Sequence, residues 1–173
     1  MLGDVRIPDT LQTPAGTLEI RACGVRKTLW IDHYAAALYV PRGASVAVLR
    51  DRHHAKAVSL RLIETRYLPE EIPSEWRHAF ERHLDSRAME RLQRIYRSLA
   101  LGDVITVVYT PARGVTVAMN GRSLLHVRGD GLVRSILRTW AGREPLSEKL
   151  RELGARHACG PRRSAPHDAA ADR

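Results

Sequence analysis

The period of the hydrophobic pattern changes twice along this chain, and that change restricts the possible fold more than any other feature. Apolar and polar residues alternate through Leu18–Ala22 and again through Ala57–Thr65, which is the spacing of half-buried strands. Between Ile72 and Leu84 the apolar residues recur at every fourth position, as in an amphipathic helix. Three further strands are predicted at Val104–Tyr109, Val115–Met119 and Ser123–Val127. Strands in blocks and helices in blocks are typical of an α+β domain, with an antiparallel sheet covered on one face by a layer of helices.

Capping and turn residues mark where these elements begin and end. Asn120-Gly121 predicts a tight hairpin, because both residues tolerate positive φ. Asp85 or Ser86 is expected to cap a second helix and Asp130 a third, since both positions precede runs of helical period. The apolar face of the third helix is predicted to hold Leu132, Val133, Ile136, Leu137 and Trp140. We expect one domain over residues 1–155, with a last short helix at 147–153, and a disordered tail over residues 156–173.

The stretch Gly24–Val40 contains the candidate site. Side chains alternate faces along a strand, so Arg26, Thr28 and Trp30 are expected on one side of a first strand. Tyr34, Ala36, Leu38 and Val40 would share one side of the next strand, with Asp32-His33 as the turn between the two. A guanidinium and a phenol would then face a space floored by small apolar side chains. That combination suits the anionic head of a mostly apolar small molecule.

Composition argues against several other functions. The formal charge is +9, but 25 of the 28 basic residues are arginine, and they are spread along the chain with few aromatics between them, so nucleic-acid binding is not predicted. No segment is long and apolar enough to span a membrane. The histidines lack the spacing of metal ligands, and neither a Ser-His-Asp arrangement nor a phosphate-binding glycine loop is found, so no metal or cofactor is predicted. The oligomeric state is left open.

The first ten residues bear on localisation. Met1–Thr10 lacks the basic region and apolar run of an export signal, so we expect a cytoplasmic protein as encoded. If the start codon is misassigned and an export signal is missing, the expectation becomes a periplasmic protein.

Several short motifs occur in a particular order along the chain. They are Ile7-Pro-Asp-Thr10, Gly24-Val-Arg26, Tyr34-Ala-Ala-Ala-Leu-Tyr-Val40, Gly102-Asp103, Asn120-Gly121, and Trp140-Ala-Gly142 followed by Pro145. In this order and spacing they resemble the chalcone isomerase-like family of the bacterial type. The resemblance implies an open-faced sandwich, in which helices cover one antiparallel sheet and a ligand cleft lies between the two layers.

The resemblance also implies roles for single residues. Arg26 matches the arginine that polarises the substrate in the plant isomerases, whereas Tyr34 replaces their threonine. The fatty-acid-binding members carry a tyrosine at that position, paired with the same arginine on the carboxylate. The tyrosine and asparagine of the isomerases' first long helix fall on Ile72 or Trp76 and on Ala79 or His83 in this chain, so neither group is kept. Thr139 does match a pocket threonine of the isomerases.

We therefore predict a non-catalytic protein that binds a fatty acid or similar amphipathic carboxylate. Arg26, Tyr34 and Thr139 would hold the head group, and Trp76 and Phe80 would line the tail channel. Trp30 and Trp140 are expected to belong mainly to the core. The alternative is an isomerase, an intramolecular lyase acting on a small enone with Arg26 as electrophile. A third possibility is an interaction module whose cleft has closed.

Overall fold

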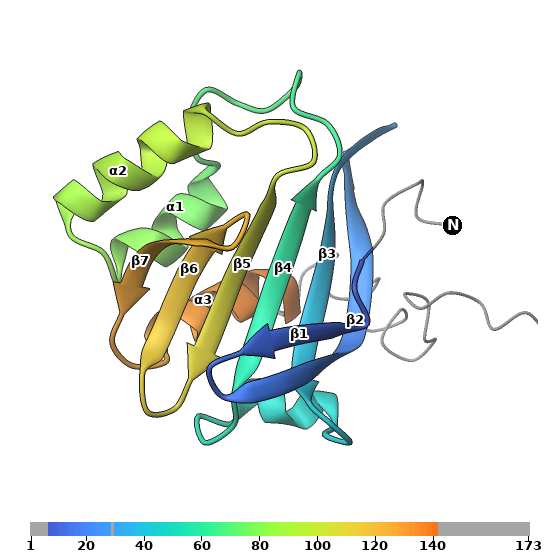
Figure 1. Ribbon diagram of the computed structural model, residues 1–173. Coiled ribbons are helices and arrows are strands. Elements are labelled where there is room, and N and C mark those ends of the chain that lie inside the picture. The colour runs from blue at the N-terminus through green and yellow to red at the C-terminus, as the bar shows by residue number, and fades with distance from the viewer. Residues whose placement is uncertain (1–6, 29, 142–173) are drawn as a thin grey trace, which may run out of the picture.

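A seven-stranded antiparallel sheet forms the centre of the molecule, and its strands lie side by side in the order in which they occur along the chain (Figure 1). The computed structural model describes residues 7–28 and 30–141. The strands are β1 Thr10–Thr13, β2 Gly16–Thr28, β3 Ile31–Pro41, β4 Lys56–Leu62, β5 Val104–Thr110, β6 Gly114–Met119 and β7 Arg122–Val127. Each of these strands pairs with its neighbours in sequence, so the described part of the sheet is a meander.

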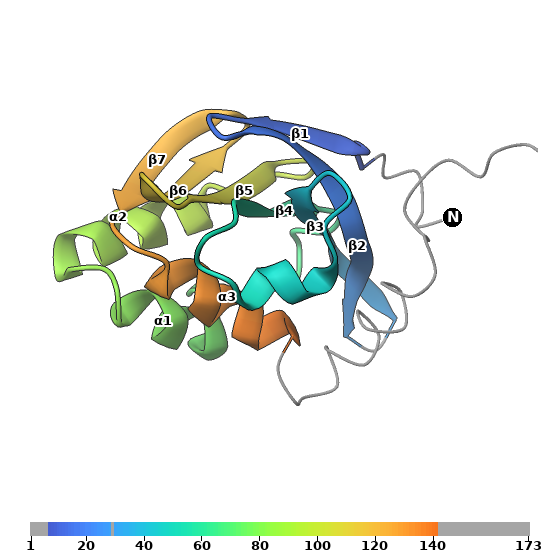
Figure 2. The same ribbon diagram turned by 90° about the horizontal axis from the view of Figure 1, so that it is seen from below.

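Within the described residues, three α-helices and one 3₁₀ helix lie on the concave side of this curled sheet, as the view in Figure 2 shows. They are η1 Val46–Arg50, α1 Ser74–Glu81, α2 Ser86–Arg97 and α3 Gly131–Ala141. Helices α1 and α2 occupy the connection between β4 and β5, and η1 occupies the connection between β3 and β4. The predicted α+β architecture, an antiparallel sheet with helices on one face, is confirmed.

The main hydrophobic core fills the space between the helices and the concave face of the sheet. Leu132, Val133, Ile136 and Leu137 of α3 are each at most 5% exposed, as the helical period predicted. They pack in one cluster with alternate residues of the central strands, among them Leu38, Val58, Val107 and Val117. The apolar side chains that alternate along the strands and those that recur every 3.6 residues along α3 therefore pack in one core.

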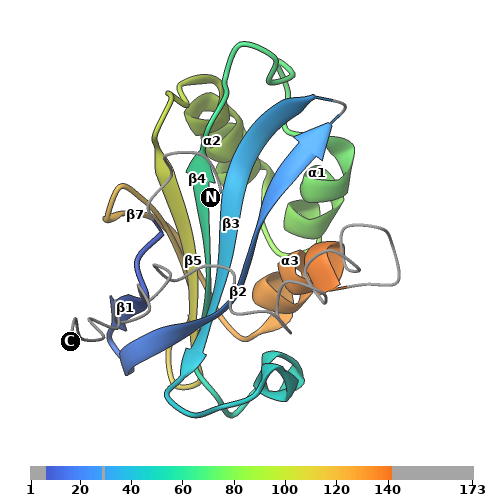
Figure 3. The same ribbon diagram turned by 90° about the vertical axis from the view of Figure 1, so that its right-hand side faces the viewer.

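A smaller apolar cluster lies on the opposite face of the sheet. Its buried members are Leu18, Cys23, Ala37, Tyr39, Ala55 and Ala57, and Leu11 of β1 packs against them. The hydroxyl of Tyr39 donates a 2.9 Å hydrogen bond to the carbonyl of Pro8. Figure 3 shows β1 on this side of the sheet, with α1 and α3 on the other. The N-terminal segment thus protects part of the face that the helices leave open.

Several predicted boundaries agree with the structure. Asp85 caps α2, accepting a 2.8 Å hydrogen bond from the backbone N–H of Ala88. Asn120 and Gly121 form the β6–β7 turn with φ of 50° and 80°, as their tolerance of positive φ predicted. The predicted first helix is shorter than expected: Ile72 and Leu84 flank α1 and lie outside it.

The predicted turn at Asp32-His33 is wrong. Both residues belong to β3, and β2 ends at Thr28, which pairs with Ile31, so the chain reverses between these two residues. His33 stays in the strand because its carbonyl accepts hydrogen bonds from the backbone N–H groups of Ile63 (2.9 Å) and Glu64 (3.2 Å). Trp30 consequently lies in the turn and is 80% exposed, so its expected place in the core is also wrong. The predicted helix at 147–153 and the tail at 156–173 lie outside the described residues.

Candidate functional site

Arg26 and Tyr34 lie directly opposite each other on β2 and β3. In an antiparallel pair, the Cβ atoms of directly opposed residues are about 4.5–5.5 Å apart and point to the same face. The same row continues to Leu62, the partner of Tyr34 on β4. Tyr34 packs against the main core, and so the face that it shares with Arg26 is the helix-covered face. The pair of strands thus brings a guanidinium and a phenol to one place.

A β-bulge lies immediately beyond this pair. Arg26 pairs with Tyr34, but the next residue, Lys27, pairs with Asp32, so His33 is the extra residue on β3. Bulges occur frequently next to functional sites, because they bend a strand and re-aim its side chains. The two hydrogen bonds that the His33 carbonyl accepts from the chain after β4 fix the bulge in position. Regular pairing is therefore interrupted after Arg26 and Tyr34, and it resumes at Lys27 and Asp32.

Small side chains adjoin the pair along the same face. Two residues before Arg26, Gly24 pairs with Ala36, and the next pair on this face is Ala22 with Leu38. Ala22 and Ala36 are 4% and 5% exposed. Ala36 and Leu38 therefore share the face of Tyr34, as alternation predicted, while a space between them and the guanidinium stays a prediction.

The two polar side chains are more exposed than the small side chains that adjoin them. Arg26 and Tyr34 are both half-buried. Within the part of the chain that the structure describes, no carboxylate forms an ion pair with Arg26. A guanidinium carries five N–H donors in a planar fork, a geometry that suits a carboxylate.

Trp76 and Phe80 belong to α1 and face the main core. Their ring centroids are 6.2 Å apart with an interplanar angle of 25°. Phe80 is a buried member of the core cluster, and Trp76 packs against that cluster while half-buried. Their role as walls of a ligand channel stays a prediction. Thr139 occupies the last part of α3, and its side chain, like that of Trp140, lies outside the described part of the structure.

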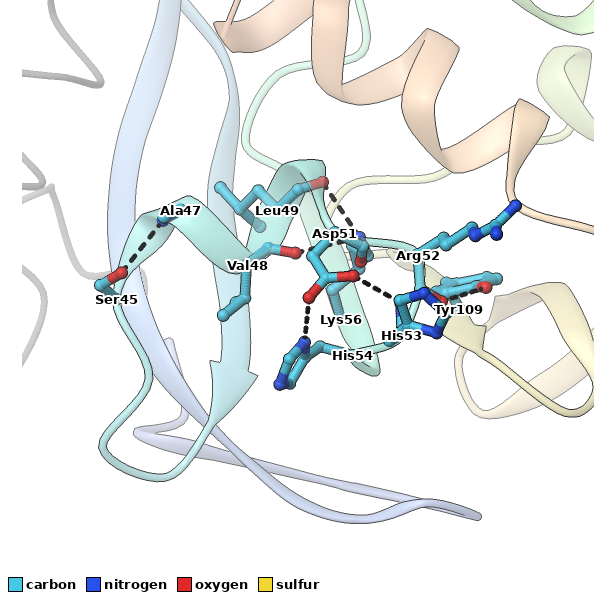
Figure 4. Close-up of polar contacts among 10 residues, drawn as sticks. All are labelled: Ser45, Ala47, Val48, Leu49, Asp51, Arg52, His53, His54, Lys56 and Tyr109. Carbon is cyan, nitrogen blue, oxygen red and sulfur yellow. Dashed lines mark hydrogen bonds and ion pairs between the residues drawn. The ribbon is translucent and has the colours of Figure 1, made fainter.

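Lys56 is a buried charged residue that the sequence analysis missed. Its side chain is on the helix-covered face of β4 and the residue is 1% exposed. Figure 4 shows its ammonium donating to the carbonyls of Val48 (3.1 Å), Leu49 (3.0 Å) and Asp51 (2.6 Å) at the end of η1. All three donors are thus used, and the cation also lies 5.4 Å from the ring centroid of Tyr109. Its position in the sequence could have revealed it, because this lysine falls on the same alternating face as the apolar residues of β4.

The environment of Lys56 indicates a structural role. Burial lowers the pKa of Lys56, and the carboxylates of Asp130 and Asp51 oppose that shift. Lys56 is six residues from Leu62 on the same strand, which corresponds to about 20 Å. It is therefore remote from Arg26 and Tyr34 and fastens η1 to the sheet.

His83 joins the end of α1 to the start of α3. Its Nε2 forms a 3.0 Å hydrogen bond with Oγ of Ser135, and its ring lies so close to Gly131 that a Cβ there would come within 2.6 Å of Cε1. Burial lowers the pKa of His83, and the guanidinium groups of Arg82 and Arg134 act in the same direction. This contact joins α1 to α3, and the lowered pKa favours the neutral form of the imidazole.

A shallow groove of about 390 Å³ lies between α1 and α2. Its lining carries both signs of charge, and it consists of Glu71, Glu81, Glu90, Arg77, Arg94 and Arg97, together with Met89 and Gln93. It shares no residue with the predicted site. Among the described residues, no group of histidine, cysteine and carboxylate side chains is arranged to hold a metal ion. None of the described helices is long and apolar enough to cross a membrane.

The fold places this protein in the class of open-faced sandwiches, in which helices cover one face of an antiparallel sheet. The sequence comparison identifies the family: the chalcone isomerase-like family matches residues 1–153, and the chain belongs to it. Among solved structures, the chain is similar to a fatty-acid binding protein of Arabidopsis thaliana. The two are 18% identical with a TM-score of 0.54, over 86% of this chain and 91% of that one. No match was found among curated protein sequences.

Proposed function

We propose that this protein binds a fatty acid or a similar amphipathic carboxylate without transforming it, with the head group held by Arg26 and Tyr34. The observation that supports the proposal most is the direct cross-strand pairing of these two residues on the helix-covered face. The structural neighbour is itself a fatty-acid binding protein, and this similarity extends the proposal to the class of ligand.

Two terms would determine the affinity. Hydrogen bonds from a guanidinium to a carboxylate contribute about 1.5–3 kcal/mol each, and a tyrosine hydroxyl adds another donor. Burial of the tail contributes about 0.8 kcal/mol per methylene, from which ordering and association costs are subtracted. Tail burial would therefore set most of the affinity, while Arg26 and Tyr34 would set the orientation. Thr139, Trp76 and Phe80 complete the proposed site.

The side chains of the first helix segment favour binding over catalysis. Ile72 and Ala79, two of the four positions implied for the isomerases' tyrosine and asparagine, are buried apolar residues at 5% and 6% exposure. Of the other two, Trp76 packs against the core, and the His83 ring is hydrogen-bonded to Ser135. None of the four supplies the hydroxyl or amide group that the resemblance implies for the isomerases, and the one side chain among them that transfers protons readily, the His83 imidazole, is engaged with Ser135.

Native mass spectrometry of gently purified protein tests the proposal. We expect a co-purifying carboxylate, and we expect Arg26→Ala to bind oleic acid at least about tenfold more weakly, which corresponds to about 1.4 kcal/mol. Arg21→Ala is the matched control, because Arg21 is an exposed arginine on the same strand. Empty protein, together with equal oleic acid affinity in Arg26→Ala and Arg21→Ala, would refute the proposal. Turnover of a chalcone that depends on Arg26 would favour the isomerase instead.

A further inference from the structure

Cys23 of β2 is a disulfide-bonded residue. The sequence contains two cysteines, and the other one is Cys159. The partner of Cys23 is therefore either Cys159 of the same chain or a cysteine of a second copy. Two cysteines so far apart show no disulfide framework in the sequence, so their spacing does not predict this bond.

The side chain of Cys23 lies on the outer face of the sheet, which the helices leave open. Cys23 pairs with Ala37 of β3, and the next pair along the strands is Gly24 with Ala36, on the helix-covered face. Successive side chains of a strand alternate faces, so Cys23 and Ala37 point outward. Cys23 is 0% exposed and belongs to the apolar cluster on this outer face. Whatever is bonded to its sulfur must therefore lie against that cluster.

We propose that Cys23 is bonded to Cys159 of the same chain, and that this disulfide holds the C-terminal segment, residues 142–173, against the outer face of the sheet. The Cα atoms of two bonded cysteines are about 4.4–6.8 Å apart. The backbone at Cys159 then lies beside β2, on the face where β1 also lies (Figure 3).

The C-terminal segment is long enough to make this connection. The described part of the chain ends at Ala141 of α3, in the helix layer on the other side of the sheet. Residues 142–159 can span up to about 60 Å when extended. A sheet of seven strands is about 30 Å wide, so the segment can pass around an edge of the sheet and reach the outer face.

Burial favours a bond within one chain over a bond between two copies. Cys23 is fully buried, and Leu18, Tyr39 and Ala57 of the same cluster are each at most 2% exposed. A second folded copy would have to displace this cover before its cysteine could reach the Cys23 sulfur. A cysteine that belongs to the same chain also has a high effective concentration at this position.

The proposed bond has two consequences. It closes a loop that includes most of the chain, and a cross-link that closes a long loop restricts the unfolded chain most. Disulfides also form and persist in oxidising compartments, whereas they are rare in a reducing cytosol. The proposal therefore favours the periplasmic alternative over the cytoplasmic expectation.

Thiol labelling with a maleimide-linked polyethylene glycol tests the bond. The full chain is trapped by acid in the cells that naturally make it, then unfolded and labelled with and without prior reduction. We expect no label without reduction and two labels after it. A tryptic digest of the purified, unreduced protein should contain peptide Ala22–Arg26 linked to peptide His157–Arg162.

Cys159→Ser is the matched variant, because it removes the bond and leaves Cys23 and the outer cluster unchanged. We expect the urea midpoint of this variant to lie about 1 M or more below that of the oxidised original protein. Reductant should lower the midpoint of the original protein to the same value and leave that of the variant unchanged. Neither readout uses Arg26 or Tyr34, so the result does not depend on the proposed function.

Three results would overturn the proposal. One is labelling of both cysteines without reduction in the acid-trapped protein. Another is a disulfide-linked dimer on a non-reducing gel, which would place the bond between two copies. The third is a urea midpoint of Cys159→Ser equal to that of the oxidised original protein, which would mean that Cys159 is not tied to the folded domain.

Discussion

Replacing Lys56 by methionine tests whether a buried ammonium holds η1 against the sheet. Methionine keeps a long unbranched side chain and removes only the charge and its three donors. The Leu49 carbonyl is buried, so leaving it without a partner costs about 1–3 kcal/mol. The Val48 and Asp51 carbonyls are partly buried and can accept water, which limits their loss to about 0.5–1.5 kcal/mol each.

Two further terms enter the balance for Lys56. The cation above the Tyr109 ring contributes about 0.5–2 kcal/mol. In the opposite direction, the methionine variant avoids the desolvation of an ammonium, the same effect that lowers the pKa of Lys56. We expect a net loss of about 2–4 kcal/mol in the free energy of unfolding, because one partner of a buried set is removed while the acceptors remain.

Urea unfolding followed by circular dichroism measures this loss as a shift of the midpoint. Arg52→Met is the matched control, since that side chain is exposed on the same connection, and we expect its effect to stay within about 0.5 kcal/mol. A Lys56→Met variant as stable as the original protein would refute the reasoning. It would mean that desolvation cancels everything the three hydrogen bonds contribute.

Three other predictions concern pH and backbone geometry. Burial and the nearby carboxylate of Asp9 raise the pKa of Tyr39 to about 12, so its contribution is complete below pH 10 and is lost as pH rises through 12; Tyr39→Phe should flatten that part of the stability profile in urea titrations. The pKa of His83 is lowered, so its contribution is complete above pH 6.5 and falls as pH falls through the folded-state pKa; His83→Gln should make the unfolding midpoint less sensitive to acid. Gly114→Ala would place a Cβ 2.3 Å from a backbone oxygen, so we expect it to cost more than about 3 kcal/mol, against about 1 kcal/mol for Gly121→Ala, where the space is open.

The layered fold could be predicted because burial imposes a period on the sequence. Residues Leu132, Val133, Ile136 and Leu137 recur at helical spacing, and each of them is buried where that spacing placed it. Capping and turn chemistry are equally local, which is why Asp85 begins α2 as expected. These signals need no knowledge of distant contacts.

The features that could not be predicted depend on contacts between distant segments. The bulge at His33 is fixed by hydrogen bonds from the chain after β4, so nothing within residues 24–40 distinguished it from a turn. Lys56 resembles a solvated lysine until the carbonyls at the end of η1 surround it. Trp30 resembled a core residue because alternation was extended past the end of β2.

One feature of the candidate site could be predicted from the sequence, and another could not. Alternation within each strand was enough to put Arg26 and Tyr34 among the candidates. Their direct opposition depended on the cross-strand register, which a bulge can shift by one residue and so move a side chain to the other face. The sequence could therefore only suggest that Arg26 and Tyr34 share a face, and the pairing of the strands was needed to show it.

A double-mutant cycle on oleic acid binding tests the central claim most directly. Arg26→Met, Tyr34→Phe and the double variant are titrated by calorimetry beside the original protein. If both groups hold one carboxylate, each single change weakens binding and the two effects are non-additive by about 0.5–3 kcal/mol, as for residues that share a partner. Affinities within about twofold of the original protein in all three variants, a difference of about 0.4 kcal/mol, would contradict it.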